Sequence, residues 1–278
     1  MKRIDLHIHT VASDGMETPE QIVSHAREEG LAAIAITDHD TVDGFQAAYN
    51  AAQGTGLEVV PGIELGTAYK GTLHILGYYI DLENRELKQE LQGIVEDRDE
   101  RNEKTVALMQ QNGIPLRYED MKVRFGSVVG KPHFAEILVE FGFAEDIQDA
   151  ISRFLQKGRK YWIPRKTLAP ERCIELILKA GGIPVIAHPF EYKYENKSLA
   201  ELIEFCMAHG LKGLECRHSN HSPGQMAYLQ LLADEYGLVK TGGSDYHGSF
   251  KPDIRLGTGR GLVNVPYSWL EELKKLRK

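Results

Sequence analysis

Residues 31–40 read LAAIAITDHD, six aliphatic residues and a threonine followed at once by an acid, a histidine and a second acid. A strand that is apolar on both sides is typical of a parallel sheet covered by helices on both faces. In parallel α/β barrels, the carboxyl ends of the strands share the face that holds the active site. The stretch therefore predicts a buried strand that delivers Asp38 and His39 to such a site.

The same pattern recurs along the chain. Glu64, His188 and Asp245 each follow a short apolar segment. Segments of this length and composition, bounded by glycine or polar residues, are typical of strands. The expected strands are residues 3–8, 31–37, 57–63, 72–80, 183–187, 211–217 and 238–243.

Helix signals stand between these strands. Residues 18–21, Thr-Pro-Glu-Gln, combine a capping threonine, a proline at the first helical position and a glutamine that can close a capping box. Asp43 and Pro223 open other helical stretches. Alternating strands and helices favour mostly parallel pairing with right-handed crossovers, so we expect an α/β barrel. A length of 278 residues suits one such domain.

The segment 83–165 interrupts the alternation. It begins with a long polar helix, 84–112, and continues through a basic segment into helices from about 132 and about 145. We expect a helical insertion, 83–165, in a barrel domain formed by 1–82 and 166–278. Two interpretations stay open: a cap beside the active site, or a solvated helical hairpin that only packs.

Composition narrows the possible partners. The net charge is −7 and 26% of residues are charged, which argues against broad binding of duplex DNA. The three cysteines are widely spaced and predict no disulfide framework, and hence a reducing compartment. We find no apolar run of ~20 residues and no signal peptide at the start, so a cytoplasmic protein without a membrane partner is expected.

The histidines and carboxylates carry most of the functional information. His7 and His9 are two apart in an extended segment, so both rings point to the same side of the strand. Asp14 follows in a turn of small residues and could reach the same site. His74 is an exception, because it lies inside its segment. His25 and His209, on predicted helices, are not expected to bind metal.

Imidazole and carboxylate together suit zinc, iron and manganese. The nine candidate ligands exceed the capacity of one ion, so two or three metals fit better. Such multinuclear sites suit the hydrolysis of phosphate esters. The candidate metal ligands are His7, His9, Asp14, His39, Glu64, His74, His188, Asp245 and His247.

At these residues the sequence resembles the polymerase and histidinol phosphatase family, called the PHP family. The matching pieces keep the expected order across nearly the whole chain, and no motif position is lost. They are residues 5–10 (DLHIHT) with 13–15 (SDG), 36–40 (ITDHD), 61–64 (PGIE), His74 with 77–78 (GY), 187–189 (AHP) and 243–247 (GSDYH).

The resemblance implies a distorted seven-stranded β/α barrel with three divalent ions, of manganese, iron or zinc. It implies that His7, His9, Glu64 and Asp245 hold one ion, that Glu64, His74 and His188 hold a second, and that Asp14, His39 and His247 hold the third. A hydroxide bridging two ions would attack phosphorus in line. Asp38 and His218 are the candidate catalytic residues: Asp38 would orient a ligand, and a histidine could protonate the leaving oxygen.

Within the family, the insertion and the length resemble the nucleotide-phosphatase branch. The resemblance is carried by residues 130–135 (GKPHFA) and 213–218 (GLECRH), with 220–222 (NHS) just after. It implies a small phosphorylated nucleotide as substrate, such as the 3′-phosphate of a nucleoside 3′,5′-bisphosphate, or short RNA. Candidate substrate-binding residues are Lys131, His133, Arg165, Arg217, His218 and His221, and candidates for stacking on a base are Tyr161, Trp162 and Tyr246.

Three alternatives stay open. A histidinol-phosphate phosphatase would use the same metals with a different pocket. A 5′-to-3′ exonuclease on short RNA would differ in substrate length and not in chemistry. A non-catalytic module that binds a nucleotide or a partner protein would usually lack some of the ligands that are present here.

Overall fold

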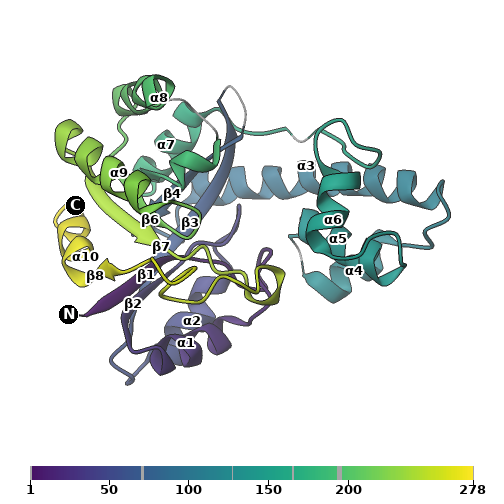
Figure 1. Cartoon of the computed structure of the whole chain (residues 1–278), viewed down its shortest axis with the longest axis horizontal. Coiled ribbons are helices and arrows are strands. Elements are labelled where there is room, and N and C mark those ends of the chain that lie inside the picture. Colours follow the sequence, from purple (N-terminus) through teal and green to yellow (C-terminus); the bar gives the residue numbers. More distant parts are fainter. Residues whose placement is uncertain (1, 70–71, 127, 165, 193–195, 278) are drawn as a thin grey trace.

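In the computed structural model, which describes residues 2–69, 72–126, 128–164, 166–192 and 196–277, the strands form one sheet. Within the described residues eight strands follow the order β7-β6-β5-β4-β3-β2-β1-β8 (Figure 1). They are β1 (Arg3–Ile8), β2 (Leu31–Ile36), β3 (Glu58–Ala68), β4 (Thr72–Tyr78), β5 (Ile183–Ile186), β6 (Gly213–His218), β7 (Val239–Gly243) and β8 (Val265–Pro266).

Backbone hydrogen bonds just beyond β7 join it to β1 and nearly close the sheet into a barrel. The Asp245 N–H donates to the His7 carbonyl (2.9 Å), and the His9 N–H donates to the Tyr246 carbonyl (3.0 Å). A Cβ on Gly243 would lie 2.4 Å from His7 Cβ, so only glycine permits this approach. The α/β barrel is confirmed. Seven strands were expected, and the structure describes eight. The additional strand, β8, has only two residues, too few to show an alternating pattern in the sequence.

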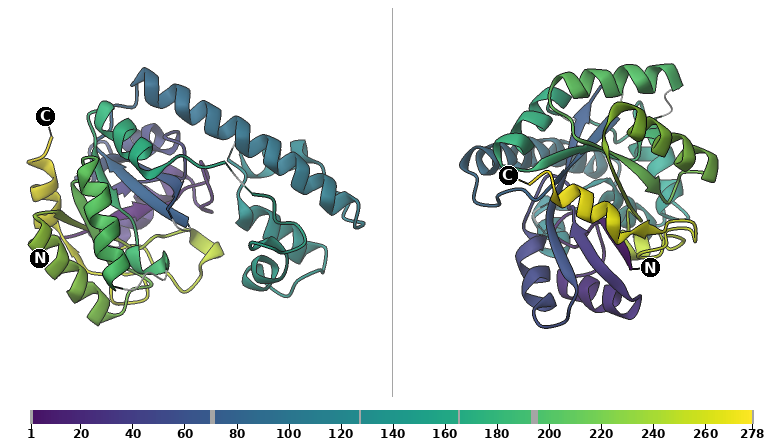
Figure 2. Two further views of the ribbon diagram at one scale, coloured as in Figure 1. Left: turned by 90° about the horizontal axis from the view of Figure 1, so that it is seen from above. Right: turned by 90° about the vertical axis from the view of Figure 1, so that its left-hand side faces the viewer.

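Helices pack against the outside of the barrel (Figure 2). The predicted capping box is present: Thr18 Oγ1 accepts from the Gln21 N–H (3.3 Å), and the Thr18 N–H donates to Gln21 Oε1 (2.8 Å). The described helices lack the combination of length and apolar character that crossing a bilayer requires. The covering helices are α1 (Pro19–Glu28), α2 (Gly44–Ala52), α7 (Pro170–Lys179), α8 (Asn196–Ala208), α9 (Pro223–Tyr236) and α10 (Tyr267–Lys274).

Strand β4 runs antiparallel to both of its neighbours, whereas β1–β2, β2–β3, β5–β6 and β6–β7 are parallel pairs. The connection from β3 is too short for a crossover, so the two strands form a hairpin. His74, near the start of β4, pairs with Gly66 of β3, and its carbonyl accepts from the Ala187 N–H (3.2 Å). The start of β4 therefore lies at the rim where the other strands end, which resolves the apparent exception of His74.

The helices between β4 and α7 form a separate lobe beside the barrel (Figure 1). Its own apolar cluster includes Met109, Phe134 and Leu138, all buried. The lobe touches the site rim, because a Cβ on Gly130 would lie 3.8 Å from Asp14 Cβ. The helix over 118–125 was not predicted. The described elements of the lobe are α3 (Arg85–Gln110), α4 (Tyr118–Phe125), α5 (Lys131–Glu140), α6 (Ile147–Ala150) and the π-helical turn η1 (Ile151–Leu155).

Candidate metal centre

All nine predicted ligands lie together at the carboxyl rim of the barrel. Their nitrogen and oxygen atoms form overlapping groups within which the atoms lie no more than 4.8 Å apart. Most of the side chains are buried, and none belongs to the lobe. Four groups contain the nine: His9, Asp14, His39 and His247; His7, His9 and Asp245; His7, Glu64 and His188; and His39, Glu64 and His74. A fifth group, Glu191, His218 and Asp245, adds two residues that were not predicted as ligands.

Glu64 lies at the centre of this arrangement. Its Oε2 is 3.3 Å from His7 Nε2, 3.2 Å from His9 Nε2 and 3.2 Å from His39 Nδ1. Among the described residues, Glu64 Oε2, His7 Nε2 and His9 Nε2 have no hydrogen-bond partner although they are buried. A buried polar atom without a partner costs about 1–3 kcal/mol. These nitrogen and oxygen atoms face one another without hydrogen-bond partners, and a bound cation would satisfy all of them.

The other oxygen of Glu64 serves two further histidines. Glu64 Oε1 lies 2.8 Å from His74 Nδ1 and 2.9 Å from His188 Nε2. The hydroxyl of Tyr192, in the 3-10 turn η2 (Pro189–Tyr192), accepts from the His74 N–H (2.7 Å). One carboxylate thus faces two different sets of imidazoles, as a bridging ligand must.

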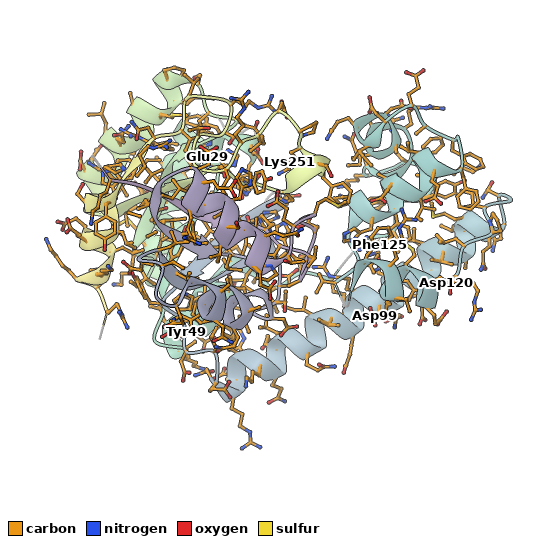
Figure 3. All side chains as sticks on the ribbon, turned by 90° about the horizontal axis from the view of Figure 1, so that it is seen from below. Glu29, Tyr49, Asp99, Asp120, Phe125 and Lys251 are labelled. Carbon is orange, nitrogen blue, oxygen red and sulfur yellow. The ribbon has the colours of Figure 1, made fainter. Side chains whose placement is uncertain are left out.

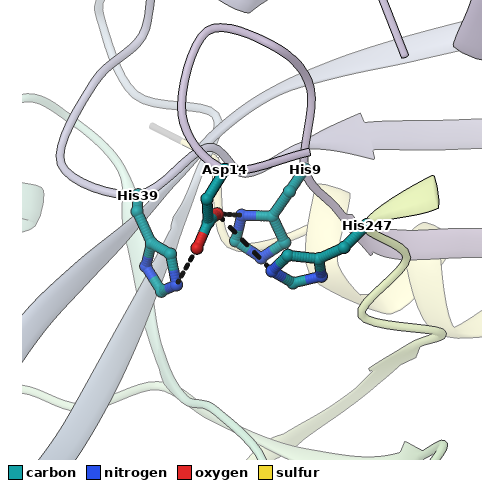
Figure 4. Close-up of side chains that lie close together, drawn as sticks. All are labelled: His9, Asp14, His39 and His247. Atoms are coloured by element: carbon teal, nitrogen blue, oxygen red, sulfur yellow. Dashed lines mark ion pairs between the residues drawn. The ribbon is translucent and has the colours of Figure 1, made fainter. Parts of the chain in front are cut away.

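A second acid, Asp14, gathers a separate group (Figure 4). Asp14 Oδ1 lies 3.5 Å from His9 Nδ1 and 3.5 Å from His247 Nε2, and Oδ2 lies 4.0 Å from His39 Nε2. The rings of His9 and His247 stack with centroids 4.1 Å apart. His9 faces this group through Nδ1 and the Glu64 group through Nε2, so its ring lies between the two.

The third acid, Asp245, completes the arrangement. Its Oδ1 lies 3.2 Å from His9 Nε2 and 3.6 Å from His7 Nε2. Its Oδ2 is 2.6 Å from Lys251 Nζ and 3.4 Å from His218 Nε2. Lys251 was not predicted as a site residue, and its contact with Asp245 was not anticipated from the sequence.

The three acids stay ionised in spite of their burial. Burial alone would raise the pKa of Glu64, but His39, His74 and His7 hold it well below the usual range. The same opposition lowers the pKa of Asp14, through His39 and His247, and of Asp245, through Lys251 and His247. Ionised carboxylates are the form that binds metal ions.

Glu215 contacts two of the candidate ligands, His7 and His188, and was not among the predicted site residues. Its Oε1 lies 3.0 Å from His7 Nδ1, and its Oε2 accepts from the His188 N–H (2.7 Å). A carboxylate on one ring nitrogen fixes the orientation of the histidine and presents the other nitrogen to the metal. It lies within β6, on the same strand as the predicted His218, and an acid so close to a candidate histidine was the available signal.

Asp38, which we expected to orient a ligand, contacts the loop that follows His9. Its oxygens accept from the Thr10 N–H (2.7 Å), the Thr10 hydroxyl (2.8 Å) and the Ser13 hydroxyl (2.5 Å). These contacts hold the loop between His9 and Asp14. Asp38 therefore positions two candidate ligands through the backbone, and its hydrogen bonds in the described structure do not go to a ligand ring.

Only some of the candidate substrate-binding residues face the cluster. Arg217 is a correction: its guanidinium donates to the Asn264 carbonyl and stacks 4.9 Å from the Trp269 ring, on the α10 side of the barrel. In a regular strand Arg217 would share a face with Glu215, but the register of β6 shifts between the two. His218 instead faces the cluster.

The remaining candidates lie in varied surroundings. His133 is buried, stacks on Phe125 (4.6 Å) and accepts the Gly130 N–H at Nδ1 (2.9 Å), so it caps α5. His221 is buried 5.1 Å from the His218 ring, and burial lowers its pKa to about 3. Lys131 is exposed at the start of α5, and Arg165 lies outside the described residues.

Two of the aromatic residues expected to stack on a base belong to apolar cores. Tyr161 is buried in the lobe against Phe154 (5.8 Å). Tyr246 is buried in the barrel, and its hydroxyl donates to Glu17. Tyr161 is enclosed in the core of the lobe, whereas Tyr246 lines a surface pocket together with His25 and Arg255. Trp162 is half-buried.

Comparison with known proteins agrees with this geometry. The PHP domain model matches residues 5–162. A 5′-3′ exoribonuclease from Haemophilus influenzae is 32% identical over 247 residues, 88% of this chain and 90% of that protein. A 3′,5′-nucleoside bisphosphate phosphatase from Chromobacterium violaceum is 32% identical over 251 residues, 89% of this chain and 88% of that protein.

A solved structure agrees as well. A predicted metal-dependent phosphoesterase from Bifidobacterium adolescentis is 30% identical and superposes with a TM-score of 0.89, covering 100% of this chain and 97% of that one. The match includes the lobe as well as the barrel. From the domain model, the sequence relatives and this superposition, the chain belongs to the PHP domain family.

Proposed function

We propose that this protein is a metal-dependent phosphoesterase that hydrolyses a phosphate monoester of a small nucleotide. The observation that carries the proposal is the convergence of five imidazoles on the two oxygens of one buried carboxylate, Glu64. The relatives named as a bisphosphate phosphatase and as an exoribonuclease both act on phosphate esters of nucleotides, which supports the substrate class.

Three divalent ions fit the donor atoms. His7, His9 and Asp245 would hold one, and Glu64 would link it to a second held by His74 and His188. Asp14, His39 and His247 would hold the third. Nitrogen and oxygen donors of this kind suit manganese, iron or zinc. When bound, such ions supply a water of lowered pKa and neutralise phosphate oxygens.

The residues of the chain itself contribute orientation and hydrogen bonding. Glu215 fixes the ring of His7, and Asp38 fixes the loop that carries Asp14. His218 accepts the Asn220 N–H at Nδ1 (3.2 Å), which leaves the proton on Nε2, the nitrogen that faces the site. The N–H held there can donate a hydrogen bond to an oxygen of the ester, and the leaving oxygen would take its proton from water.

The lobe, for which we expect the bounds 83–165, would cap the site. The N-terminus of α5 lies beside Asp14. Gly126 of the same lobe lies against Val11, because a Cβ on Gly126 would be 3.4 Å from the Val11 carbonyl oxygen. This contact favours a cap over a hairpin with only a packing role. With Lys131 at its edge, the cap would suit the second phosphate of a nucleoside 3′,5′-bisphosphate, whose 3′-phosphate is the group we expect to be removed.

The proposal is tested by a phosphate-release screen of the manganese-loaded protein. The panel would contain 3′,5′-bisphosphates, mononucleotides, histidinol phosphate and a short 5′-phosphorylated RNA. We expect 3′,5′-bisphosphates to be the best substrates. Preference for histidinol phosphate, or a ladder of RNA products, would select one of the alternatives, and no hydrolysis at all would point to a non-catalytic module.

Variants show whether the release comes from this site. Glu64→Ala and Asp245→Ala should abolish turnover, because each removes a ligand shared within the cluster. His25→Ala, on α1 and outside the cluster, is the control and should leave turnover unchanged. Near-normal turnover in either ligand variant, with metal supplied, would contradict the assigned roles.

A further inference from the structure

Two hydrogen-bond donors converge on the outer oxygen of Asp245. Lys251 Nζ lies 2.6 Å from Oδ2, and His218 Nε2 lies 3.4 Å from the same atom. The inner oxygen, Oδ1, faces His9 and His7 instead. The two oxygens of this carboxylate therefore face different environments, one lined by metal-binding nitrogens and the other by donors.

The His218 donor lacks an acceptor. Its Nδ1 accepts from the Asn220 backbone N–H, so Nε2 carries the proton. Nε2 is fully buried, and the described residues give it no hydrogen-bond partner, because its approach to Asp245 lacks the required geometry. A buried donor in this state favours binding of an acceptor from outside the chain.

Lys251 is placed where a ligand can reach it. It follows the 3-10 turn η3 (Gly248–Phe250), and its side chain is 31% exposed, against 5% for Asp245. Figure 3 shows it at the edge of the barrel that faces the lobe. An ammonium group has three N–H donors, and its hydrogen bond to Asp245 uses one of them.

We propose that Lys251 and His218 together bind an oxygen of the substrate phosphoryl group, which makes Lys251 a substrate-binding residue. The inference rests on the proposed function. Asp245 Oδ2 marks the place where such an acceptor is received, and a phosphate dianion is a stronger partner for an ammonium than a carboxylate already shared with other cations. The ammonium also fills the outer side of the Glu191, His218 and Asp245 group, which leaves that position unsuited to a further metal ion.

The test uses the manganese-loaded full chain and inorganic phosphate, the expected product. Titration calorimetry would give the dissociation constant for phosphate, and elemental analysis would give the metal content. Lys251→Met keeps the length of the side chain without its charge. We expect it to weaken phosphate binding roughly tenfold or more with metal content unchanged, and Lys251→Arg to restore most of the binding.

Lys240 is the matched control, because its Nζ also lies 2.6 Å from an aspartate oxygen, on Asp234, away from the cluster. Lys240→Met should bind phosphate like the wild type. Unchanged phosphate binding in Lys251→Met would overturn the proposal. A parallel loss of metal and phosphate without rescue by Lys251→Arg would also overturn it, since Lys251 would then only hold Asp245.

The two proposals fail in different ways. If the wild type releases phosphate from no ester, the proposed function is wrong whatever the variants do. If the wild type turns over and Lys251→Met matches it in KM and in phosphate binding, only the role of Lys251 is wrong.

Discussion

At the scale of single residues, the site depends on which nitrogen of each imidazole faces the cluster. Glu215 lies on Nδ1 of His7, and the Asn220 N–H lies on Nδ1 of His218. Each contact leaves Nε2 directed at the acids. Both supporting groups come from β6 and the turn that follows it, so this one strand sets the orientation of rings on two sides of the cluster.

Replacement of Glu215 tests this directly. Glu215→Ala should weaken metal binding by about 10–100-fold, because His7 loses the partner that fixes its ring. Glu215→Gln keeps an oxygen acceptor and should lose less. Metal titration measures both, with Glu28→Ala, an exposed position on α1, as control. Equal metal affinity in Glu215→Ala and the wild type would exclude an orienting role.

The cysteines provide a test of burial. Cys173, Cys206 and Cys216 are buried and form no disulfide among the described residues. Burial raises the pKa of Cys206 to about 12, and the neighbouring Glu171 adds to the effect. A raised pKa lowers the fraction of reactive thiolate, to ~10⁻⁴ at pH 8. Iodoacetamide at pH 8 should therefore leave Cys206 unmodified in the native protein and label it in urea, as read by mass spectrometry. Rapid labelling of the native protein would show that the α8 region is open.

At the scale of elements, α3 is tied to the rim that carries the candidate ligands by a buried ion pair. Arg98 donates to Asp40 Oδ2, and Asp40 Oδ1 accepts from the Gly66 N–H (3.1 Å). Asp40 directly follows His39 and has a positive φ of 56°. His188 and Asp245 also have positive φ values, so three of the four non-glycine residues with this conformation in the described chain lie at the site.

Loss of one partner of this pair should be costly. Arg98→Met leaves the charge of Asp40 buried, so we expect about 3–5 kcal/mol less free energy of unfolding. The double variant with Asp40→Asn should recover part of that loss, because no unpaired charge remains. Urea unfolding of the four proteins gives the comparison. An additive double variant would mean that the two side chains do not interact energetically.

The regular elements were predictable where local chemistry decides them. The capping box at Thr18 and the apolar strand over 31–36 form as expected. One element that was not predicted depends on a distant partner: β8 exists because Val265 pairs with Ile4 of β1. Arg217 was misplaced for the same kind of reason, since the irregular register of β6 is set by its pairing with β7 and not by its own sequence.

At the scale of the whole molecule, barrel closure brings together ligands from both ends of the chain. His7 and Asp245 are adjacent because the strands that carry them meet at the closing edge. The nine candidate ligands could be named from the sequence because the PHP motifs preserve them. The approach of Lys251 and His218 to the same oxygen of Asp245 could not be predicted, because it depends on how the loop after β7 folds back over the rim.

Metal should stabilise the fold as a whole. Divalent ions bind ligands that are assembled only in the folded chain, so a concentration of ~100 times Kd adds about 2.7 kcal/mol for each site. We expect a chelator to lower the Tm and manganese to restore it, as followed by scanning calorimetry. Glu64→Ala should show a much smaller manganese effect. Equal shifts in that variant and the wild type would place the stabilising ions elsewhere.

The most direct test of the account is a crystal structure of the manganese-loaded protein with anomalous scattering recorded at the manganese edge. The account predicts three anomalous peaks at the barrel rim, each beside one of the groups built on Glu64, Asp14 and Asp245. A map with no peak there, or with peaks only at surface carboxylates, would contradict the central claim that these nine side chains form one metal centre.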